Sequence, residues 1–196
     1  MPFTEKDAWY LERARELALR AAPSLIEPNP PVGAILAVED RILGEGYHRR
    51  FGGPHAEIEA LHSVSDPAAL PSATLYVTLE PCCHIAKKTP PCVPAIVEAG
   101  IRRVVIGSLD PNPAVQGKGM VALQTAGIET LLAPDPRPFQ KLLRHFLVNL
   151  TQNRPYITLK WAQSAGPSHT FPFTGGIIGH KRIGRWPISG FWGRVW

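Results

Sequence analysis

The sequence predicts an α/β protein in which a mixed sheet of about five strands lies between two layers of helices. From residue 57 onward, short segments rich in β-branched and aromatic residues alternate with segments of helical periodicity, which implies crossover connections and parallel pairing. Two earlier apolar segments are joined by a short turn, as in an antiparallel pair. The 196 residues, 44% of them hydrophobic, provide one substantial core but not two full enzyme domains.

The N-terminal part is expected to hold one helix and two strands. Residues 4–21 begin with a capping box and carry apolar side chains at helical spacing. Four prolines within residues 23–31 predict an irregular loop. Residues 32–40 and 41–48 follow as two strands, which should pair antiparallel.

Alternating helices and strands make up the rest of the predicted domain. In chain order they are a helix at 55–64, a strand at 73–80, a helix at 91–100, a strand at 102–109, a helix at 119–129, a strand at 129–134 and a helix at 138–150. Prolines in the first turn and a glycine at the end mark the second of these helices. The last helix is strongly amphipathic.

Charge and cysteine usage exclude several classes of protein. No stretch reaches the roughly 20 apolar residues of a membrane span, and the charged N-terminus is unlike a signal peptide, so we expect a cytoplasmic protein. Nine basic residues and no acidic ones follow Asp135. Residues 1–135 therefore carry a net charge of −4, which argues against nucleic-acid binding. All three cysteines lie within residues 82–92, which favours a metal site over a disulfide framework.

A histidine, a glutamate and two cysteines form the candidate catalytic group. His55 and Glu57 open one predicted helix, and Cys82 and Cys92 bracket the entry to the next. One His and two Cys supply the three protein ligands of a catalytic zinc, whose fourth position takes water and lowers its pKa from ~15.7 to about 7. Glu57 stays uncoordinated and can move that water's proton to a ring nitrogen and to departing ammonia. H-x-E followed by P-C and a second Cys is the signature of zinc deaminases.

Each of these residues has a plainer interpretation when taken alone. A single His at a helix start is usually a surface or capping residue, and paired cysteines can be small core side chains. A closed structural zinc site, with Cys83 or His84 as the fourth ligand, is a third interpretation. The whole arrangement, PHAE and then EPC after one intervening strand, favours the catalytic zinc.

Longer segments resemble the deaminase part of the bifunctional deaminase/reductase family of riboflavin biosynthesis. They are GGPHAEIEAL, TLYVTLEPCCHIAKKTPPCVPAIVEAGIRRVVIGSLDPNPAVQGKGM and LQTAGIE. Cytidine and tRNA adenosine deaminases usually carry a shorter P-C-x-x-C, whereas Cys82 and Cys92 lie ten residues apart. The resemblance implies a cytidine-deaminase-like three-layer fold, Zn²⁺ bound by His55, Cys82 and Cys92, and Glu57 as the catalytic proton carrier.

The resemblance also implies a set of substrate contacts. A planar pyrimidine needs a side-chain amide that orients it, and a ribose phosphate needs a cation and neutral donors. By matching motifs, the family's pyrimidine-binding groups fall on Asn29 and His48. Its phosphate-binding groups fall on His84 and Lys88, and its groups near the ribose fall on Asp110 and Asn112. A turn residue among prolines is the plainer interpretation of Asn29, and a solvated loop residue that of Lys88.

The sequence departs from the family in two places. The loop HIAKKTPPC has one extra residue and lacks the family's glycine, which changes the setting of the phosphate contacts. NRPYITLKWAQS matches the start of the family's reductase domain, but a Gly-, Pro- and Trp-rich sequence without sustained period follows. We therefore expect a zinc-dependent pyrimidine deaminase domain at residues 1–152. Residues 153–196 are expected to be the remnant of a reductase start with an aberrant, disordered tail and no reductase activity.

The activity implied by the resemblance is a hydrolytic deamination. It converts 2,5-diamino-6-(5-phosphoribosylamino)pyrimidin-4-one to 5-amino-6-(5-phosphoribosylamino)uracil and ammonia. The expected partner is this small phosphoribosyl pyrimidine, with no nucleic acid and no membrane, and a homo-oligomer is left open. Two alternatives stay open as well: a nucleic-acid or nucleoside deaminase, and a zinc-stabilised inactive product of a frameshifted gene.

Overall fold

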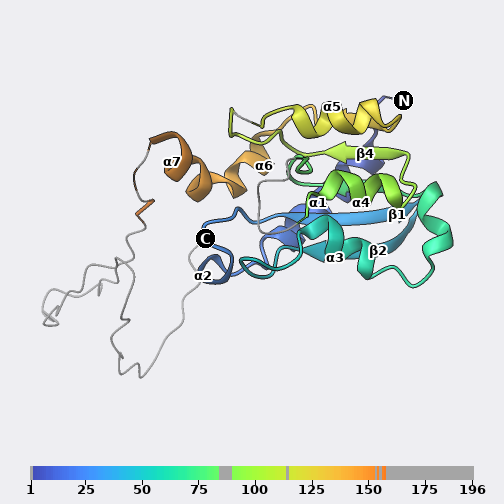
Figure 1. Ribbon diagram of the computed structural model, residues 1–196, viewed down its shortest axis with the longest axis horizontal. Coiled ribbons are helices and arrows are strands. Elements are labelled where there is room, and N and C mark those ends of the chain that lie inside the picture. The colour runs from blue at the N-terminus through green and yellow to red at the C-terminus, as the bar shows by residue number, and fades with distance from the viewer. Residues whose placement is uncertain (1, 84–89, 114, 153, 155, 158–196) are drawn as a thin grey trace, which may run out of the picture. The chain divides into compact units, whose positions relative to one another are not determined.

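A five-stranded sheet forms the core of the described part of the chain in the computed structural model, which describes residues 2–83, 90–113, 115–152, 154 and 156–157 (Figure 1). These residues belong to a single unit that ends at Ile157. The strands are β1 (Gly33–Val38), β2 (Arg41–Tyr47), β3 (Thr74–Val77), β4 (Arg103–Ile106) and β5 (Glu129–Leu132), in the sheet order β2-β1-β3-β4-β5. Among the described helices, none combines the length and apolar character that a membrane span needs.

Strand pairing is mixed, as the sequence predicts. β1 lies antiparallel to both β2 and β3, whereas β3, β4 and β5 run parallel to one another. The turn from β1 to β2 contains Glu39 with a φ of 52°, in the left-handed region that tight turns use. Parallel strands end at the same edge of a sheet, so the segments that follow β3 and β4 meet there.

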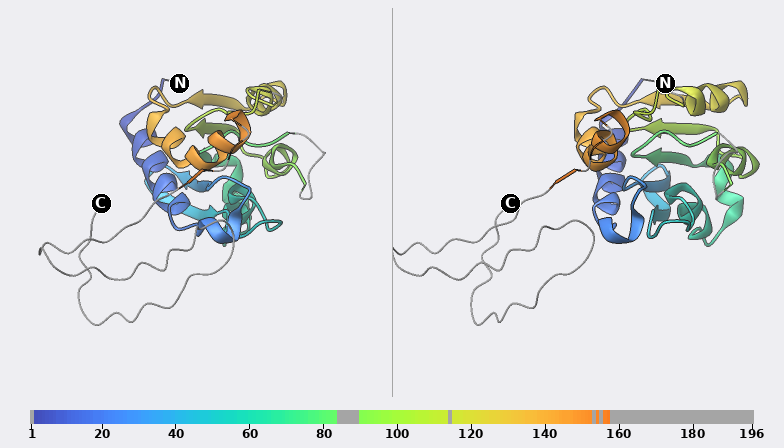
Figure 2. Two further views of the ribbon diagram at one scale, coloured as in Figure 1. Left: turned by 90° about the vertical axis from the view of Figure 1, so that its left-hand side faces the viewer. Right: turned by 60° about the vertical axis from the view of Figure 1, so that its left-hand side comes forward.

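Helices cover both faces of the sheet and complete the three predicted layers (Figure 2). Residues of β1 alternate between the faces, because successive side chains of a strand point in opposite directions. The helical segments are α1 (Glu5–Ala18), α2 (Pro23–Ile26), α3 (Ala56–His62), the 3₁₀ helix η1 (Pro67–Ser72), α4 (Cys92–Glu98), α5 (Lys118–Thr125), α6 (Arg137–Leu142) and α7 (Arg144–Gln152). Ala34 and Leu36 pack with α3, α4 and α5, whereas Ile35 and Ala37 pack with α1 and α6.

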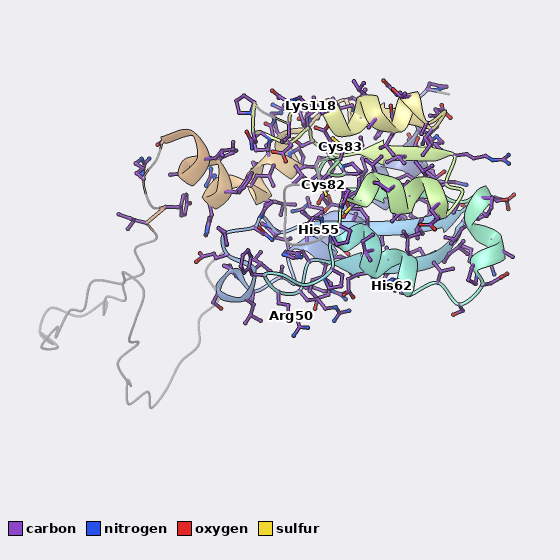
Figure 3. All side chains as sticks on the ribbon, viewed as in Figure 1. Arg50, His55, His62, Cys82, Cys83 and Lys118 are labelled. Atoms are coloured by element: carbon purple, nitrogen blue, oxygen red, sulfur yellow. The ribbon has the colours of Figure 1, made fainter. Side chains whose placement is uncertain are left out.

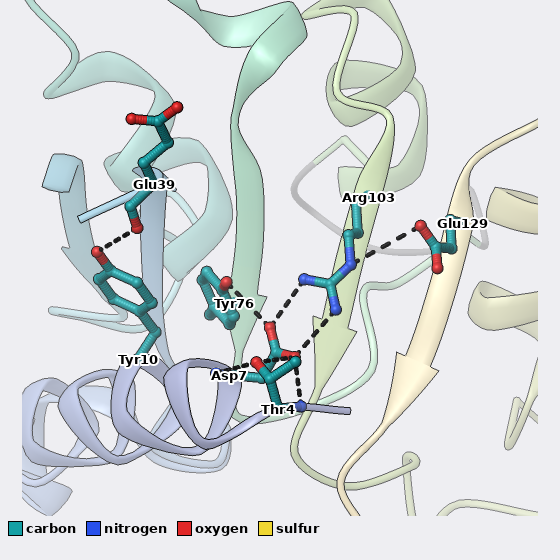
Figure 4. Close-up of polar contacts among 7 residues, drawn as sticks. All are labelled: Thr4, Asp7, Tyr10, Glu39, Tyr76, Arg103 and Glu129. Atoms are coloured by element: carbon teal, nitrogen blue, oxygen red, sulfur yellow. Dashed lines mark hydrogen bonds and ion pairs between the residues drawn. The ribbon is translucent and has the colours of Figure 1, made fainter. Parts of the chain in front are cut away.

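The predicted capping box of α1 also attaches this helix to the sheet (Figure 4). The Thr4 backbone N–H donates to the Asp7 carboxylate at 2.8 Å. The same carboxylate accepts hydrogen bonds from both terminal nitrogens of Arg103, at 2.8 and 3.0 Å, and from the Tyr76 hydroxyl at 3.1 Å. Burial alone would raise the pKa of Asp7, but the bonds from Arg103 and Thr4 lower it to about 2. The buried charge is therefore well partnered and ties α1 to β3 and β4.

Some predicted elements differ from the structure. The proline-rich loop contains one helical turn, α2, because Pro23 occupies the first helical position, where its missing N–H is not needed. The helix predicted at 138–150 is divided into α6 and α7 at Leu143, a buried residue with φ −88° and ψ 4°, so packing overrides helical propensity there. The short helix η1 was not expected, and the strand predicted within NRPYITLKWAQS lies mostly outside the described residues.

Candidate metal centre

Two helix starts and one strand end bring the three candidate ligands together; Figure 3 labels two of them, His55 and Cys82. His55 is the N-cap of α3, Cys92 is the first residue of α4, and Cys82 follows β3. The His55 Nδ1 atom lies 3.1 Å from the Cys92 Sγ and 3.5 Å from the Cys82 Sγ, and the two Sγ atoms are 3.7 Å apart. The backbone N–H groups of Cys92 and Val93 both donate to the Cys82 carbonyl, which closes the loop between the cysteines.

The geometry of this cluster fits a tetrahedral zinc. The three ligand atoms lie within 4.8 Å of one another. With Zn–S bonds near 2.3 Å, two ligands of a tetrahedral site are about 3.8 Å apart, which matches the spacing of 3.7 Å between the Sγ atoms. Cys83 does not belong to the group. The three ligands found among the described residues leave one tetrahedral position open, as in catalytic zinc sites.

The charge of Cys82 suits metal binding, whereas the hydrogen bond with Cys82 and burial raise the pKa of the Cys92 thiol. The hydrogen bond with Cys92, helped by one with His55, outweighs burial and lowers the pKa of the Cys82 thiol to about 4. The thiolate is the form that binds zinc. Glu57, in the first turn of α3, is only 3% exposed, and its carboxyl hydrogen-bonds the Cys92 side chain. Burial raises the pKa of Glu57, which makes its carboxylate a better proton acceptor than an exposed one.

Asn29 and His48 lie next to the cluster and contact each other. The Asn29 Nδ2 lies 3.0 Å from the His48 Nε2, and the His48 Nδ1 lies 3.0 Å from the carbonyl of Pro54. A carbonyl only accepts, so Nδ1 carries the ring proton and Nε2 accepts from the Asn29 amide. Burial lowers the pKa of His48, in keeping with a neutral ring. Because both of its nitrogens are engaged, His48 orients Asn29, and its ring packs edge-on against that of His55 with centroids 5.7 Å apart.

The loop after β4 carries the two residues predicted at the ribose. Asp110 Oδ1 accepts from the Asn112 backbone N–H at 2.9 Å, a local turn that orders the loop. The Asp110 backbone N–H donates to Glu80 at 3.0 Å, two positions before the ligand Cys82. The sequence analysis did not predict a role for Glu80. The available signal was an acidic residue in the T-L-E-P-C segment, at the end of a predicted strand. His84 and Lys88, the residues predicted at the phosphate, lie outside the described residues.

The three-layer fold, the His-Cys-Cys cluster and the buried Glu57 define a zinc deaminase of the cytidine-deaminase type. Residues 4–108 match the protein family described as the cytidine and deoxycytidylate deaminase zinc-binding region. The chain is 47% identical over 160 residues to the riboflavin biosynthesis protein RibD of Aquifex aeolicus, covering 82% of this chain and 44% of that protein. It is 40% identical over 150 residues to the diaminohydroxyphosphoribosylamino-pyrimidine deaminase of Buchnera aphidicola, covering 76% of this chain and 99% of that protein. The chain belongs to the riboflavin-biosynthesis deaminase family.

Solved structures agree with this assignment. RibD of Acinetobacter baumannii superposes with a TM-score of 0.71 at 41% identity, over 78% of this chain and 42% of that one. The Rib2 deaminase of Aspergillus oryzae superposes with a TM-score of 0.52 at 25% identity, over 74% of this chain and 88% of that one. The predicted cytidine-deaminase-like fold and the predicted zinc cofactor are thereby confirmed. The chain spans less than half the length of the RibD proteins that it matches.

Proposed function

We propose that this chain deaminates 2,5-diamino-6-(5-phosphoribosylamino)pyrimidin-4-one in riboflavin biosynthesis, giving 5-amino-6-(5-phosphoribosylamino)uracil and ammonia. The main support is the Buchnera deaminase, a relative whose length is matched to 99% at 40% identity. Further support comes from the Aspergillus Rib2 deaminase, which was solved in complex with DARIPP. The net negative charge of residues 1–135 speaks against the alternative of a nucleic-acid deaminase.

The chemistry follows from the placement of Glu57 beside the three ligands. When His55, Cys82 and Cys92 bind zinc, the metal supplies Lewis-acid activation of a water molecule. Glu57 accepts a proton from the attacking water and passes protons to the ring nitrogen and then to the departing amino group. The C–N bond to that amino group breaks as the new C–O bond becomes a carbonyl, so one water is consumed and one ammonia is released. Burial of Glu57 keeps this proton transfer apart from bulk solvent.

Substrate recognition is proposed to use the neighbouring polar residues. Asn29, with its amide held by His48, is suited to hydrogen-bond the edge of a planar pyrimidine. Asp110 and Asn112, in the loop beside the cysteine segment, are proposed at the ribose. For His84 and Lys88 at the phosphate, the support is the family resemblance alone.

A direct assay tests the proposed activity. Zinc-loaded protein is incubated with the phosphoribosyl diaminopyrimidinone, and in parallel with cytidine, deoxycytidylate and tRNA, and ammonia release is measured. We expect turnover of the phosphoribosyl substrate alone, lowered by about 10²- to 10⁴-fold in Glu57→Gln. Preferential turnover of a nucleoside or RNA would favour the nucleic-acid or nucleoside alternative. An absence of turnover on every substrate, with zinc fully bound, would favour the inactive product.

We also propose that the deaminase domain comprises residues 1–152 and that residues 153–196 add no reductase activity. The match of NRPYITLKWAQS to a reductase start, followed by a sequence without sustained period, supports this proposal. The measurement is NADPH oxidation by the full chain in the presence of the deaminated product. Oxidation at a rate comparable to deamination would refute it.

A further inference from the structure

The buried carboxylate of Glu80 connects two parts of the site. One is the ligand segment, Glu80 to Cys82, and the other is the substrate loop, which follows β4 and contains Asp110 and Asn112. Glu80 is 5% exposed. Its Oε1 accepts from the backbone N–H groups of Gly119 at 2.7 Å and Met120 at 3.1 Å. Its Oε2 accepts from those of Gly117 at 2.9 Å and Asp110 at 3.0 Å. One side chain thus binds four main-chain donors spread over eleven residues.

The charge of Glu80 is balanced by backbone dipoles. Among the described residues, no lysine or arginine forms an ion pair with it. Two of its four donors belong to the first turn of α5, where a helix presents partial positive charge. Hydrogen bonds from N–H groups to a carboxylate are stronger than neutral ones, and a buried carboxylate without them would be costly. The backbone at Asp110 and at residues 117, 119 and 120 is therefore held firmly to Glu80.

A close backbone contact reinforces the same junction. A Cβ atom at Gly119 would lie 2.0 Å from the carbonyl oxygen of Pro81, so only glycine allows α5 to approach this residue. The backbone N–H of Glu80 in turn donates to the Ser108 carbonyl at 2.9 Å. Pro81 directly precedes the zinc ligand Cys82, so the substrate loop and the ligand segment form one packed unit.

We propose that Glu80 is a positioning residue of the deaminase, which sets the distance between the zinc ligand Cys82 and the substrate-contacting residues Asp110 and Asn112. This inference rests on the proposed function. Asp110 takes its place through its own N–H bond to Glu80, and its side chain then orients Asn112. Glu80 is not one of the three candidate zinc ligands, and both of its carboxylate oxygens accept from backbone N–H groups. Its replacement should displace the ribose side of the site and leave the zinc and Glu57 in place.

The test is a double-mutant cycle on the full chain. Glu80→Gln keeps the size of the side chain but places an amide N–H₂ against two N–H donors. We expect full zinc content, a KM for the phosphoribosyl substrate raised about tenfold, and a kcat changed less than about threefold. Because both residues act through one loop, adding Glu80→Gln to Asn112→Ala should raise KM little further. Glu98→Gln, the same substitution on an exposed helix position, should change nothing.

A merely structural role gives a different result. Glu80→Gln would then lower zinc content or kcat, or its effect on KM would multiply with that of Asn112→Ala, and either outcome would overturn the proposal. If Glu80→Gln does not fold, Glu80→Asp, which keeps the charge but shortens the reach by one methylene, replaces it in the cycle.

Amide hydrogen exchange separates this proposal from the proposed function. In Glu80→Gln, exchange should accelerate at Asp110, Gly117 and Gly119 while α4 keeps the protection of the wild type. Unchanged exchange at these three amides would refute the positioning role whatever the substrate. If the wild-type protein fails to deaminate the phosphoribosyl substrate, the proposed function fails, and the exchange measurement still decides the role of Glu80 in holding the loop.

Discussion

Residues that are close in sequence at the metal centre differ in whether their side chains reach the ligand cluster. Cys82 and Cys83 are adjacent, yet only the Sγ of Cys82 joins His55 and Cys92. Glu57 sits two residues after the histidine ligand, buried but outside the ligand cluster. The backbone at a strand end and at two helix starts therefore decides which side chains join the ligand cluster, and it places Glu57 where we propose that it moves protons.

The first prediction concerns the choice between the cysteines. Cys92→Ala should lose most of the bound zinc, because two ligands cannot hold a catalytic zinc tightly. Cys83→Ala should keep one zinc per chain, and metal analysis of the purified proteins measures both. Loss of zinc in Cys83→Ala with retention in Cys92→Ala would reverse the ligand assignment.

The second prediction concerns Glu57. Glu57→Gln should keep the zinc and the fold while kcat falls by about 10²- to 10⁴-fold, because the amide cannot carry the protons. Glu59→Gln is the matched control, since this neighbour on α3 pairs with Arg49 at 3.2 Å. Steady-state kinetics at matched zinc content measure the effect. Near-normal turnover of Glu57→Gln would remove the residue from the mechanism.

At the scale of elements, one buried carboxylate joins three of them. Asp7 caps the start of α1, and its bonds to Tyr76 and Arg103 reach β3 and β4. Arg103 also lies 3.8 Å from Glu129 on β5. The N-terminal helix is thus attached by a specific polar contact in addition to the apolar packing of Tyr10 and Leu11.

The third prediction is a pH dependence of stability carried by Asp7. Its pKa is about 2 in the folded protein, below the value of about 3.9 for an unfolded chain. Its contribution is therefore present above the unfolded pKa and is lost as the pH falls through the folded pKa. The difference in unfolding free energy between wild type and Asp7→Asn should shrink by about 1 kcal/mol between about pH 6 and about pH 3.

Urea unfolding of the zinc-free proteins at both pH values measures this difference, so that release of zinc at the lower pH does not contribute. Glu98→Gln, on the exposed side of α4, serves as the control. A difference between wild type and Asp7→Asn that stays constant with pH would show that the ion pair with Arg103 adds no proton-linked stability.

At the scale of the whole molecule, the described residues form one folded unit that contains all the groups of the metal centre. That unit ends at Ile157. The match to the Buchnera protein covers 76% of this chain and 99% of that protein. That relative is therefore about as long as the deaminase part alone. Both observations support the prediction that residues of this unit suffice for the zinc site.

The fourth prediction is that a shortened chain of residues 1–157 keeps its zinc and its deaminase activity. Its kcat/KM should lie within about twofold of that of the full chain, because the described contacts among His55, Cys82 and Cys92 are internal to the unit. Metal analysis and ammonia release on both proteins measure this. A shortened chain that folds but loses activity would mean that later residues contribute to the site.

Local sequence patterns predicted most of the fold. The capping box, the β-branched segments and the order of strands and helices lead to a three-layer mixed sheet, as found. Local patterns also placed His55 at the start of α3 and Cys92 at the start of α4. The boundaries that failed, α2 and the break at Leu143, are places where packing outweighs propensity.

The sequence by itself determined the zinc chemistry, because the identity and order of His55, Glu57, Cys82 and Cys92 already form a deaminase signature. Only the tertiary structure decided how the polar groups around it are held. Asn29 meets His48 across 19 positions, and Glu80 binds N–H donors 30 to 40 positions away. The physical reason is that a buried polar group must find its partners wherever the fold brings donors and acceptors together, and no local pattern of residues encodes that choice.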